Sequence, residues 1–444
     1  MEITQTVSAQ TGERIYRKIT WRLLPFLLLC YMVAQIDRFN IGFAKLQFLK
    51  DLNVNDAVFG VAASMFAVGY VAFEVPSNLM LARIGVRKTL LRIMVLWGIV
   101  SLLMSFAQGA YYLYVMRFLL GVAEAGFFPG IIVYLTYWYP NRHRGRIMSL
   151  FVIAVPIAGA IGGPMAGWLM DRLHGVSGWQ GWQWLFFVEG VPAVILGIIA
   201  FFYLHDNPER AGWLSPDEKQ FVLGELESDR VAGPGKPPKN FRDALLDPKI
   251  YLFSSIYFSY FCSLNTILLW SPTLLRIVGL QKVTDIGRWS GLISVISTIG
   301  MLAVGYSSDR FMERRWHVAL CGISAAACFL LLPLASHSIG VTIALLMVAS
   351  IGIFSILSLF WTIPSAYLEG RAMAGGIALI SSIGYLGAVV SPTLVGWIKV
   401  TTGSLYIGLS TIAVMLIASM LLLVVFVPAP IRLKISPPET ASLK

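Results

Sequence analysis

Residues 339–366, IGVTIALLMVASIGIFSILSLFWTIPSA, form a run of 28 residues without a single Asp, Glu, Lys or Arg. A bilayer core of about 30 Å needs about 20 apolar residues in a crossing helix. Lipid offers the backbone no hydrogen bonds, and runs this long and evenly apolar are unlike the strands of a membrane barrel. We therefore predict an all-α membrane protein with twelve transmembrane helices, at residues 23–46, 57–80, 89–108, 111–136, 146–170, 183–204, 250–275, 287–308, 316–336, 339–366, 372–398 and 403–427.

Composition and charge agree with this prediction. Only 13% of the 444 residues are charged, against about 25% in soluble domains. With twelve spans, 25 of the 34 Lys and Arg residues fall on the side that holds both termini, seven fall on the opposite side, and two lie inside helices. This positive-inside bias predicts cytoplasmic termini in a multi-pass protein of the cell inner membrane. It also accounts for the net charge of +11 without a nucleic-acid partner.

The long polar stretch in the middle of the chain divides it into three parts. We expect an N-terminal six-helix bundle at 1–204, a cytoplasmic linker loop at 205–249, and a C-terminal six-helix bundle with its tail at 250–444. Within the linker, Ser215 and Pro216 followed by two acids are typical of a helix start.

A weak internal repeat relates the two bundles. Pro164 and Pro392 lie in similar glycine-rich segments 228 residues apart, and Arg83 and Arg310 lie in similar basic loops 227 residues apart. Two pairs at nearly one offset favour duplicated, pseudo-symmetric halves, as in many transporters.

Enzymatic and metal sites are not indicated. The four cysteines lie in apolar runs without CxxC spacing, and the chain has neither a GxxxxGK[ST] nor an HExxH motif. The polar first 20 residues predict no cleaved signal peptide. We expect no cofactor other than protons as the coupling ion.

Two pairs of charges lie within the predicted helices, where an ionised group costs about 2.5–3.5 kcal/mol. Asp37 and Arg38 lie about 20 Å into the first helix at 1.5 Å per residue. Arg117 and Glu124 lie seven residues apart on one face of the fourth helix. Glu74 and Glu189 are also intramembrane, and we interpret both as structural.

The 6+6 layout and the basic loops resemble the major facilitator superfamily. Within it, four motifs resemble the anion:cation symporter family, which includes galactonate, tartrate, phthalate and hydroxyphenylacetate permeases: DRFN at 37–40, Gly69-Tyr70 with PSN at 76–78, RFLLGVAEAGFFPG at 117–130, and GGIALI at 375–380. The resemblance covers residues 20–428 and implies that the first and fourth helices are neighbours around one cavity. Ala82, Ser381 and Tyr385 depart from the family pattern, in which Asp or Asn is usual at these places.

The four charges then suggest a mechanism. When both acids are ionised they pair with the arginines, and when Asp37 and Glu124 are protonated the guanidinium groups of Arg38 and Arg117 become free to bind a carboxylate. The alternative is a static set of salt bridges that fixes helix packing.

The remaining candidates are neutral pocket residues and basic loop residues. We expect Tyr70, Asn265, Trp361, Ser381 and Tyr385 to line the substrate pocket, with plain packing as the alternative. Arg83, Arg87, Asp309 and Arg310 are candidates for a cytoplasmic gate, with membrane topology alone as the alternative.

These interpretations predict a proton-coupled symporter that imports a small organic carboxylate by alternating access, with an aromatic acid among the candidates. An exchanger or exporter of organic anions is the main alternative, and a non-transporting membrane sensor is a more distant one. The expected partners are the organic anion and membrane lipids, and we expect a monomer.

Overall fold

The computed structural model describes residues 2–232, 247–311, 313–367 and 373–427. Within these residues the chain is helical apart from short connections. Its α-helices are α1 Glu2–Asp51, α2 Asp56–Ile84, α3 Val86–Met104, α4 Ala110–Glu124, α5 Phe127–Thr136, α6 Asn141–Val152, α7 Ala154–Arg172, α8 Gly181–Tyr203, α9 Pro216–Ala232, α11 Pro248–Ile277, α12 Val283–Arg310, α13 Arg315–Leu331, α14 Ile339–Phe360, α15 Thr362–Tyr367, α16 Met373–Thr402 and α17 Leu405–Phe426.

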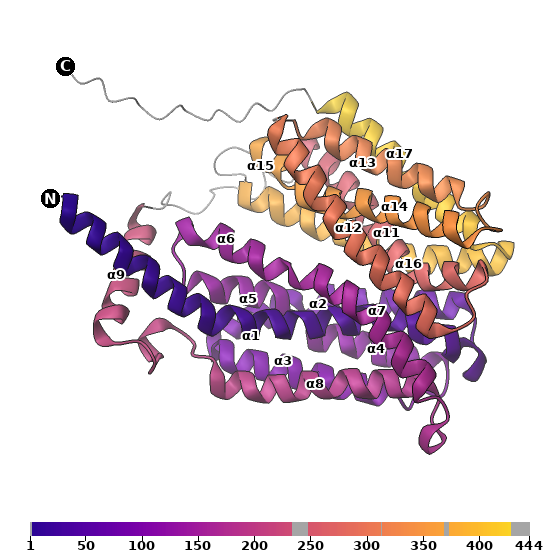
Figure 1. The fold of residues 1–444 in the computed structure, drawn as a ribbon, viewed down its shortest axis with the longest axis horizontal. Helices are drawn as coiled ribbons and strands as arrows, with labels where there is room; N and C mark the ends of the chain where they lie inside the picture. Colours follow the sequence, from indigo (N-terminus) through magenta and orange to yellow (C-terminus); the bar gives the residue numbers. More distant parts are fainter. Residues whose placement is uncertain (1, 233–246, 312, 368–372, 428–444) are drawn as a thin grey trace.

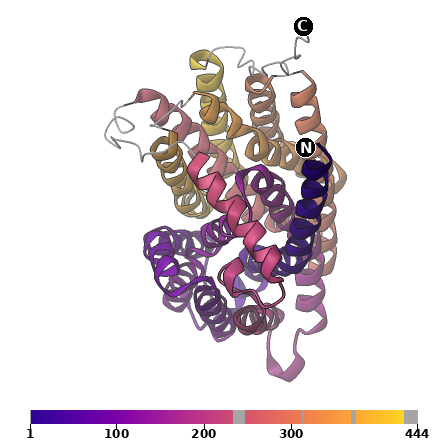
Figure 2. The same ribbon diagram turned by 90° about the vertical axis from the view of Figure 1, so that its left-hand side faces the viewer.

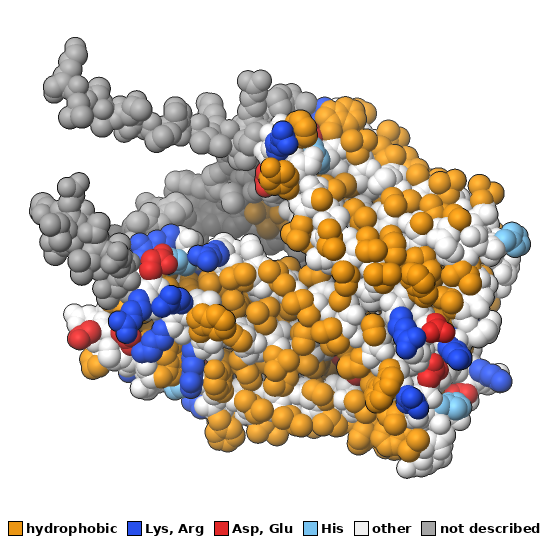
Figure 3. Space-filling view, in the orientation of Figure 1, with side chains coloured by type: hydrophobic (Ala, Val, Ile, Leu, Met, Phe, Trp, Pro, Cys, Tyr) orange, Lys and Arg blue, Asp and Glu red, His pale blue; other side chains and the backbone are white. Residues whose placement is uncertain are grey.

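The predicted fold class is confirmed. Ten helical segments in the described part of the chain are long and apolar enough to cross a membrane. The other two predicted runs are also helical. The third corresponds to α3, whose first seven residues include three basic ones, and the ninth corresponds to α13, which is shorter. A broad hydrophobic band covers the flank of the molecule, and charged side chains gather at its two ends (Figure 3).

Three of the predicted helices are broken, which the apolar pattern did not reveal. The fourth run is divided into α4 and α5 at Ala125 and Gly126, the fifth into α6 and α7 at Ile153, and the tenth into α14 and α15 at Trp361. Apolar runs continue across each of these breaks, so hydropathy alone cannot locate them.

The helices form two halves that are stacked on each other (Figure 1). In the first half α1 packs against α7 and α8, α2 against α4, and α3 against α8. In the second half α11 packs against α16, and α13 against α14 and α17. The halves meet where α7 contacts α12, α2 contacts α16 and α1 contacts α11.

Close helix approach depends on small residues at the crossings. The backbone of α2 passes so near Gly121 of α4 that any Cβ there would overlap the carbonyl oxygen of Phe66. This is the packing role expected of small residues in membrane helices.

Helix α9 lies on the first half of the protein (Figure 2). It begins as predicted, because Ser215 Oγ accepts a hydrogen bond from the Glu218 amide (3.2 Å) and the Glu218 carboxylate accepts one from the Ser215 amide (2.9 Å). Glu225 accepts from the Tyr16 hydroxyl at 2.8 Å and pairs with Arg142 at 2.5 Å. Residues 233–246 of the expected linker lie outside the described residues, and the domain boundaries stay predictions.

An ionic cluster joins the halves at the end opposite the N terminus. Asp56 of α2 pairs with Lys399 of α16 at 2.6 Å and with Lys45 of α1 at 3.2 Å. The Lys45 ammonium is buried and lies 3.4 Å from the ring centroid of Trp270 in α11. Nearby, the Thr284 amide and hydroxyl both donate to Asp171 at 2.7 Å. Charge pairing and cation–π contacts therefore hold the two halves together at this end.

We expect Asp56→Asn to destabilise the protein by about 3 kcal/mol, because it leaves the buried Lys45 without a counter-ion. Thermal unfolding of the purified protein measures this loss. The matched control is Asp285→Asn, whose exposed pair with Arg288 should contribute little. Equal unfolding temperatures for the two variants would contradict the role given to Asp56.

Candidate functional site

An ion pair joins α1 to α4 inside the first half. Arg38 Nε lies 2.7 Å from Glu124 Oε1, and the Glu124 side chain is 1% exposed while that of Arg38 is 20% exposed. The Arg38 guanidinium also lies 5.1 Å from the ring centroid of Tyr70 and 5.6 Å from that of Phe66. Because α1 packs mainly on α7 and α8, the long Arg38 side chain makes the connection to α4.

The break between α4 and α5 places Glu124 at a helix end. Ala125 leaves the helical conformation (ψ 131°), and Gly126 adopts the left-handed conformation (φ +85°) that glycine tolerates best. Ser77 of α2 lies directly against Gly126, so a Cβ at that position would come within 2.5 Å of the Ser77 hydroxyl. The break and its contact with α2 thus fix the backbone position from which the Glu124 side chain extends.

Asp37 is held by neutral donors and by no ion pair among the described residues. Its Oδ2 accepts from Trp97 Nε1 at 2.9 Å, and its Oδ1 accepts from Ser101 Oγ at 2.7 Å and from Asn40 Nδ2 at 3.2 Å. The residue is 1% exposed. Asp37 and Arg38 are adjacent in sequence, yet their side chains bind different partners: Asp37 binds neutral donors and Arg38 binds Glu124.

Glu189 of α8 belongs to the same group as Asp37, although the sequence suggested a separate structural role. Its Oε2 accepts from Asn40 Nδ2 at 2.6 Å, and the residue is 4% exposed. Sequence reasoning gave no role to Trp97 and Ser101, and it named Asn40 only as part of the DRFN motif. The only signal was the three-residue spacing of Asp37 and Asn40, which puts both on one helical face.

Arg117 is a buried cation without an ion pair among the described residues. It is 3% exposed, and its Nε and Nη1 atoms have no hydrogen-bond partner in that part of the chain. Its guanidinium lies 4.9 Å from the centroid of the Phe66 ring, which Arg38 also contacts, and it is within electrostatic range of Asp37 and Glu124. The sequence paired both acids with both arginines, whereas the structure forms only the Arg38–Glu124 pair.

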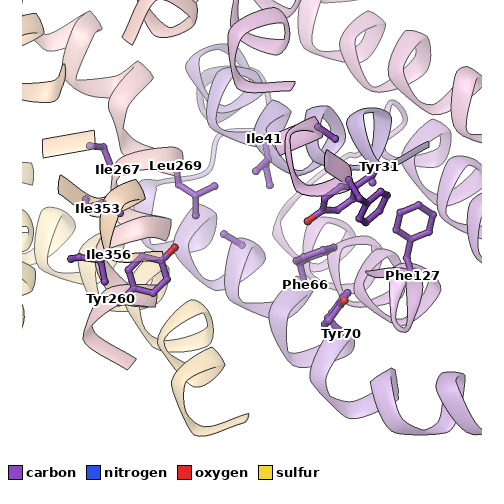
Figure 4. Packing of buried hydrophobic residues seen from close by; sticks show 14 of the residues in the cluster. Tyr31, Ile41, Phe66, Tyr70, Phe127, Tyr260, Ile267, Leu269, Ile353 and Ile356 are labelled. Atoms are coloured by element: carbon purple, nitrogen blue, oxygen red, sulfur yellow. The ribbon is translucent and has the colours of Figure 1, made fainter. Parts of the chain in front are cut away.

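Among the expected pocket residues, two meet at the boundary of the halves. The rings of Tyr70 and Tyr385 stack with centroids 5.6 Å apart, beside the Arg38 guanidinium. Figure 4 shows Phe66 and Tyr70 gathered with Tyr31 and Phe127 in the first half, and Tyr260 in the second.

Trp361 is linked to Tyr385 through successive ring contacts of Tyr257 and Phe261. Asn265 and Ser381 form no described contact with Tyr70 or Tyr385. The Asn265 amide donates to the Phe261 carbonyl of its own helix at 3.0 Å, and Trp361 packs edge-on against Tyr257 with centroids 4.8 Å apart. Ser381 is exposed.

The candidate gate residues make contacts within one half each. Arg87 donates from Nε to the Phe201 carbonyl at 2.8 Å, which fastens α3 to the end of α8. Asp309 pairs with Arg314, while Arg83 and Arg310 are exposed. Gating by these residues stays a prediction.

Comparison with known proteins gives three consistent matches. A family model described as Major Facilitator Superfamily matches residues 27–392. The chain is 42% identical over 416 residues to a candidate tartrate transporter of Agrobacterium vitis, covering 94% of this chain and 92% of that protein. It is 41% identical over 413 residues to the candidate metabolite transport protein NicT of Pseudomonas putida, covering 93% and 94%.

A solved structure has the same fold. The bacterial homologue of the human lysosomal transporter Spinster, in an inward-facing and occupied conformation, matches with a TM-score of 0.69 at 17% identity, over 90% of this chain and 94% of that one.

We expect Gly126→Ala to cost about 1–2 kcal/mol, because an alanine is strained in the left-handed conformation, and to displace Glu124 through the clash with Ser77. Thermal unfolding checks the stability, and a pairwise cross-link between cysteines placed at 38 and 124 checks the geometry. Gly109→Ala is the control, since a Cβ there meets nothing within 4 Å. A Gly126→Ala protein as stable as the control would refute this account of the break.

Proposed function

Because the chain belongs to the Major Facilitator Superfamily and is a secondary transporter rather than an enzyme, we propose that it is a proton-coupled symporter that imports a small organic carboxylate. The observation that carries the proposal is a pair of guanidinium groups that both contact the Phe66 ring close to the Glu124 carboxyl. One, Arg38, is held by Glu124 at 2.7 Å, and the other, Arg117, has unused donors.

Coupling follows from competition for Arg38. An ionised Glu124 occupies the Arg38 guanidinium, so a substrate carboxylate finds only Arg117 there. Protonation of Glu124 removes that competitor, and both guanidinium groups can then donate charge-assisted hydrogen bonds to the substrate. By linkage, a bound carboxylate favours the protonated form of Glu124 by the same free energy.

The substrate class rests on the chemistry of these neighbours. Planar guanidinium groups suit a carboxylate, and the similarity to a protein named for tartrate transport supports a small organic acid. The aromatic rings of Phe66, Tyr70 and Tyr385 would contact the body of the substrate, which favours an acid with an apolar or aromatic part.

We place the protein in the inner membrane with cytoplasmic termini, as the positive-inside distribution favours. The Asp56 cluster then lies at the extracellular end. Contacts of Lys399 with Asp56 and of Thr284 with Asp171 favour a state that is closed on that side. Alternating access would require these contacts to break when the substrate site faces outward.

The substrate can be identified by thermal-shift screening of purified protein with aliphatic, sugar-derived and aromatic acids at pH 5.5 and pH 8. The acid that stabilises most becomes the substrate for uptake into proteoliposomes. Uptake driven by an inward proton gradient and abolished by an uncoupler supports symport. Uptake that requires only internal anion, regardless of the gradient, would favour the exchanger.

We expect Glu124→Gln to abolish proton-driven uptake of that acid while sparing part of its counterflow, because glutamine cannot bind or release the coupling proton. Both rates are measured in the same proteoliposomes. Glu209→Gln, at an exposed position, is the control and should leave both rates unchanged. Normal acid-driven uptake by the Glu124→Gln protein would remove this residue from the proton path.

We expect Arg117→Lys to weaken binding of that acid about ten- to hundred-fold, the cost of losing one hydrogen bond between charged groups. Isothermal titration measures the affinity directly. Arg172→Lys, an exposed change of the same kind, should have no effect. An unchanged affinity in the Arg117→Lys protein would show that Arg117 is not a substrate ligand.

A further inference from the structure

Two buried carboxyl groups share one amide nitrogen in the first half. Asn40 Nδ2 lies 2.6 Å from Glu189 Oε2 and 3.2 Å from Asp37 Oδ1. The three residues are between 1% and 4% exposed. They come from only two helices, since Asp37 and Asn40 lie on α1 and Glu189 lies on α8.

The two carboxyl groups accept different numbers of hydrogen bonds from their neighbours. Asp37 receives two further hydrogen bonds, from Trp97 and Ser101 of α3. Glu189 Oε1 is buried and has no partner among the described residues, and α8 contains no other charged residue. On α4 the nearest cation is Arg117, which acts on Asp37. No other titratable group of the packed helices forms a described contact with Glu189.

This arrangement is unfavourable for two negative charges. Two carboxylates around one amide repel each other, and an ionised Glu189 would hold part of its charge on an oxygen without a donor. A proton on either group removes the repulsion. Asn40 Oδ1 is itself buried without a partner, so a rotated amide could accept a hydrogen bond from a protonated carboxyl.

We propose that Glu189 is a further proton-carrying residue of the transport cycle, in a two-carboxyl site with Asp37 that is bridged by Asn40. The site shares no described hydrogen bond or ion pair with Arg38 or Glu124, so a proton bound there breaks no guanidinium–carboxylate pair. The inference rests on the proposed symport for its role in transport. The site itself can be tested without any substrate.

The experiment is infrared difference spectroscopy of the intact purified protein as the pH is raised from 5.5 to 9. Deprotonation of the site removes the carbonyl band of a protonated carboxyl. We expect this loss in the wild-type protein and in Glu124→Gln, and we expect Glu189→Gln to lack one such component. An unaltered difference spectrum in Glu189→Gln would overturn the proposal.

A second variant keeps the test valid if Glu189→Gln fails to fold. Asp37→Asn removes the neighbouring charge but leaves Glu189 in place, so the Glu189 band should disappear at lower pH, by about one unit, as expected for the loss of a close like charge. A band that keeps its wild-type pH dependence in Asp37→Asn would show that the two carboxyls do not form one site.

The outcomes also separate this inference from the proposed function. Normal proton-driven uptake by Glu124→Gln together with the expected infrared changes would leave the Glu189 site intact and reject the Glu124 switch. Loss of proton-driven uptake in Glu124→Gln, together with an unaltered infrared difference spectrum in Glu189→Gln, would reject the Glu189 site alone.

Discussion

The ion pair between Arg38 and Glu124 is the interaction on which the proposed chemistry depends. It crosses from α1 to α4 in an apolar interior, where neither charge can be left alone at low cost. The fold surrounds the pair with aromatic rings and places it beside the contact between Tyr70 and Tyr385, where the two halves meet. In the proposed mechanism, protonation and substrate binding therefore act at one place, close to the contact between the two halves.

The sequence was sufficient for the architecture because membrane helices are determined by a strong physical requirement. Apolar length predicts where the chain crosses the bilayer, and charge burial singled out Asp37, Arg38, Arg117 and Glu124 as residues that need partners. The helix starting at Pro216 was also predictable, because its capping residues Ser215 and Glu218 lie only three positions apart in the sequence.

The hydrogen-bond and ion-pair partners of these charged residues were less predictable, because they depend on the rotation of each helix within the bundle. Asp37 and Arg38 are neighbours in the chain, but they face Trp97 and Glu124 respectively. Neutral donors such as Ser101 and Asn40 carry no signature that hydropathy or charge could detect. The connection of Glu189 to Asp37 through Asn40 is visible only when α1 and α8 are placed side by side.

The sharing of Asp56 between two lysines determines which charges would lose a partner if the two halves separated at this end. If the halves separate, Asp56 loses Lys399 of the opposite half but keeps Lys45 of its own half. Lys45 then keeps its counter-ion but loses its contact with the Trp270 ring of the opposite half, while Lys399, already 21% exposed, returns to water. Separation at this end would therefore leave no buried charge without a counter-ion, because Asp56 and Lys45 belong to the same half.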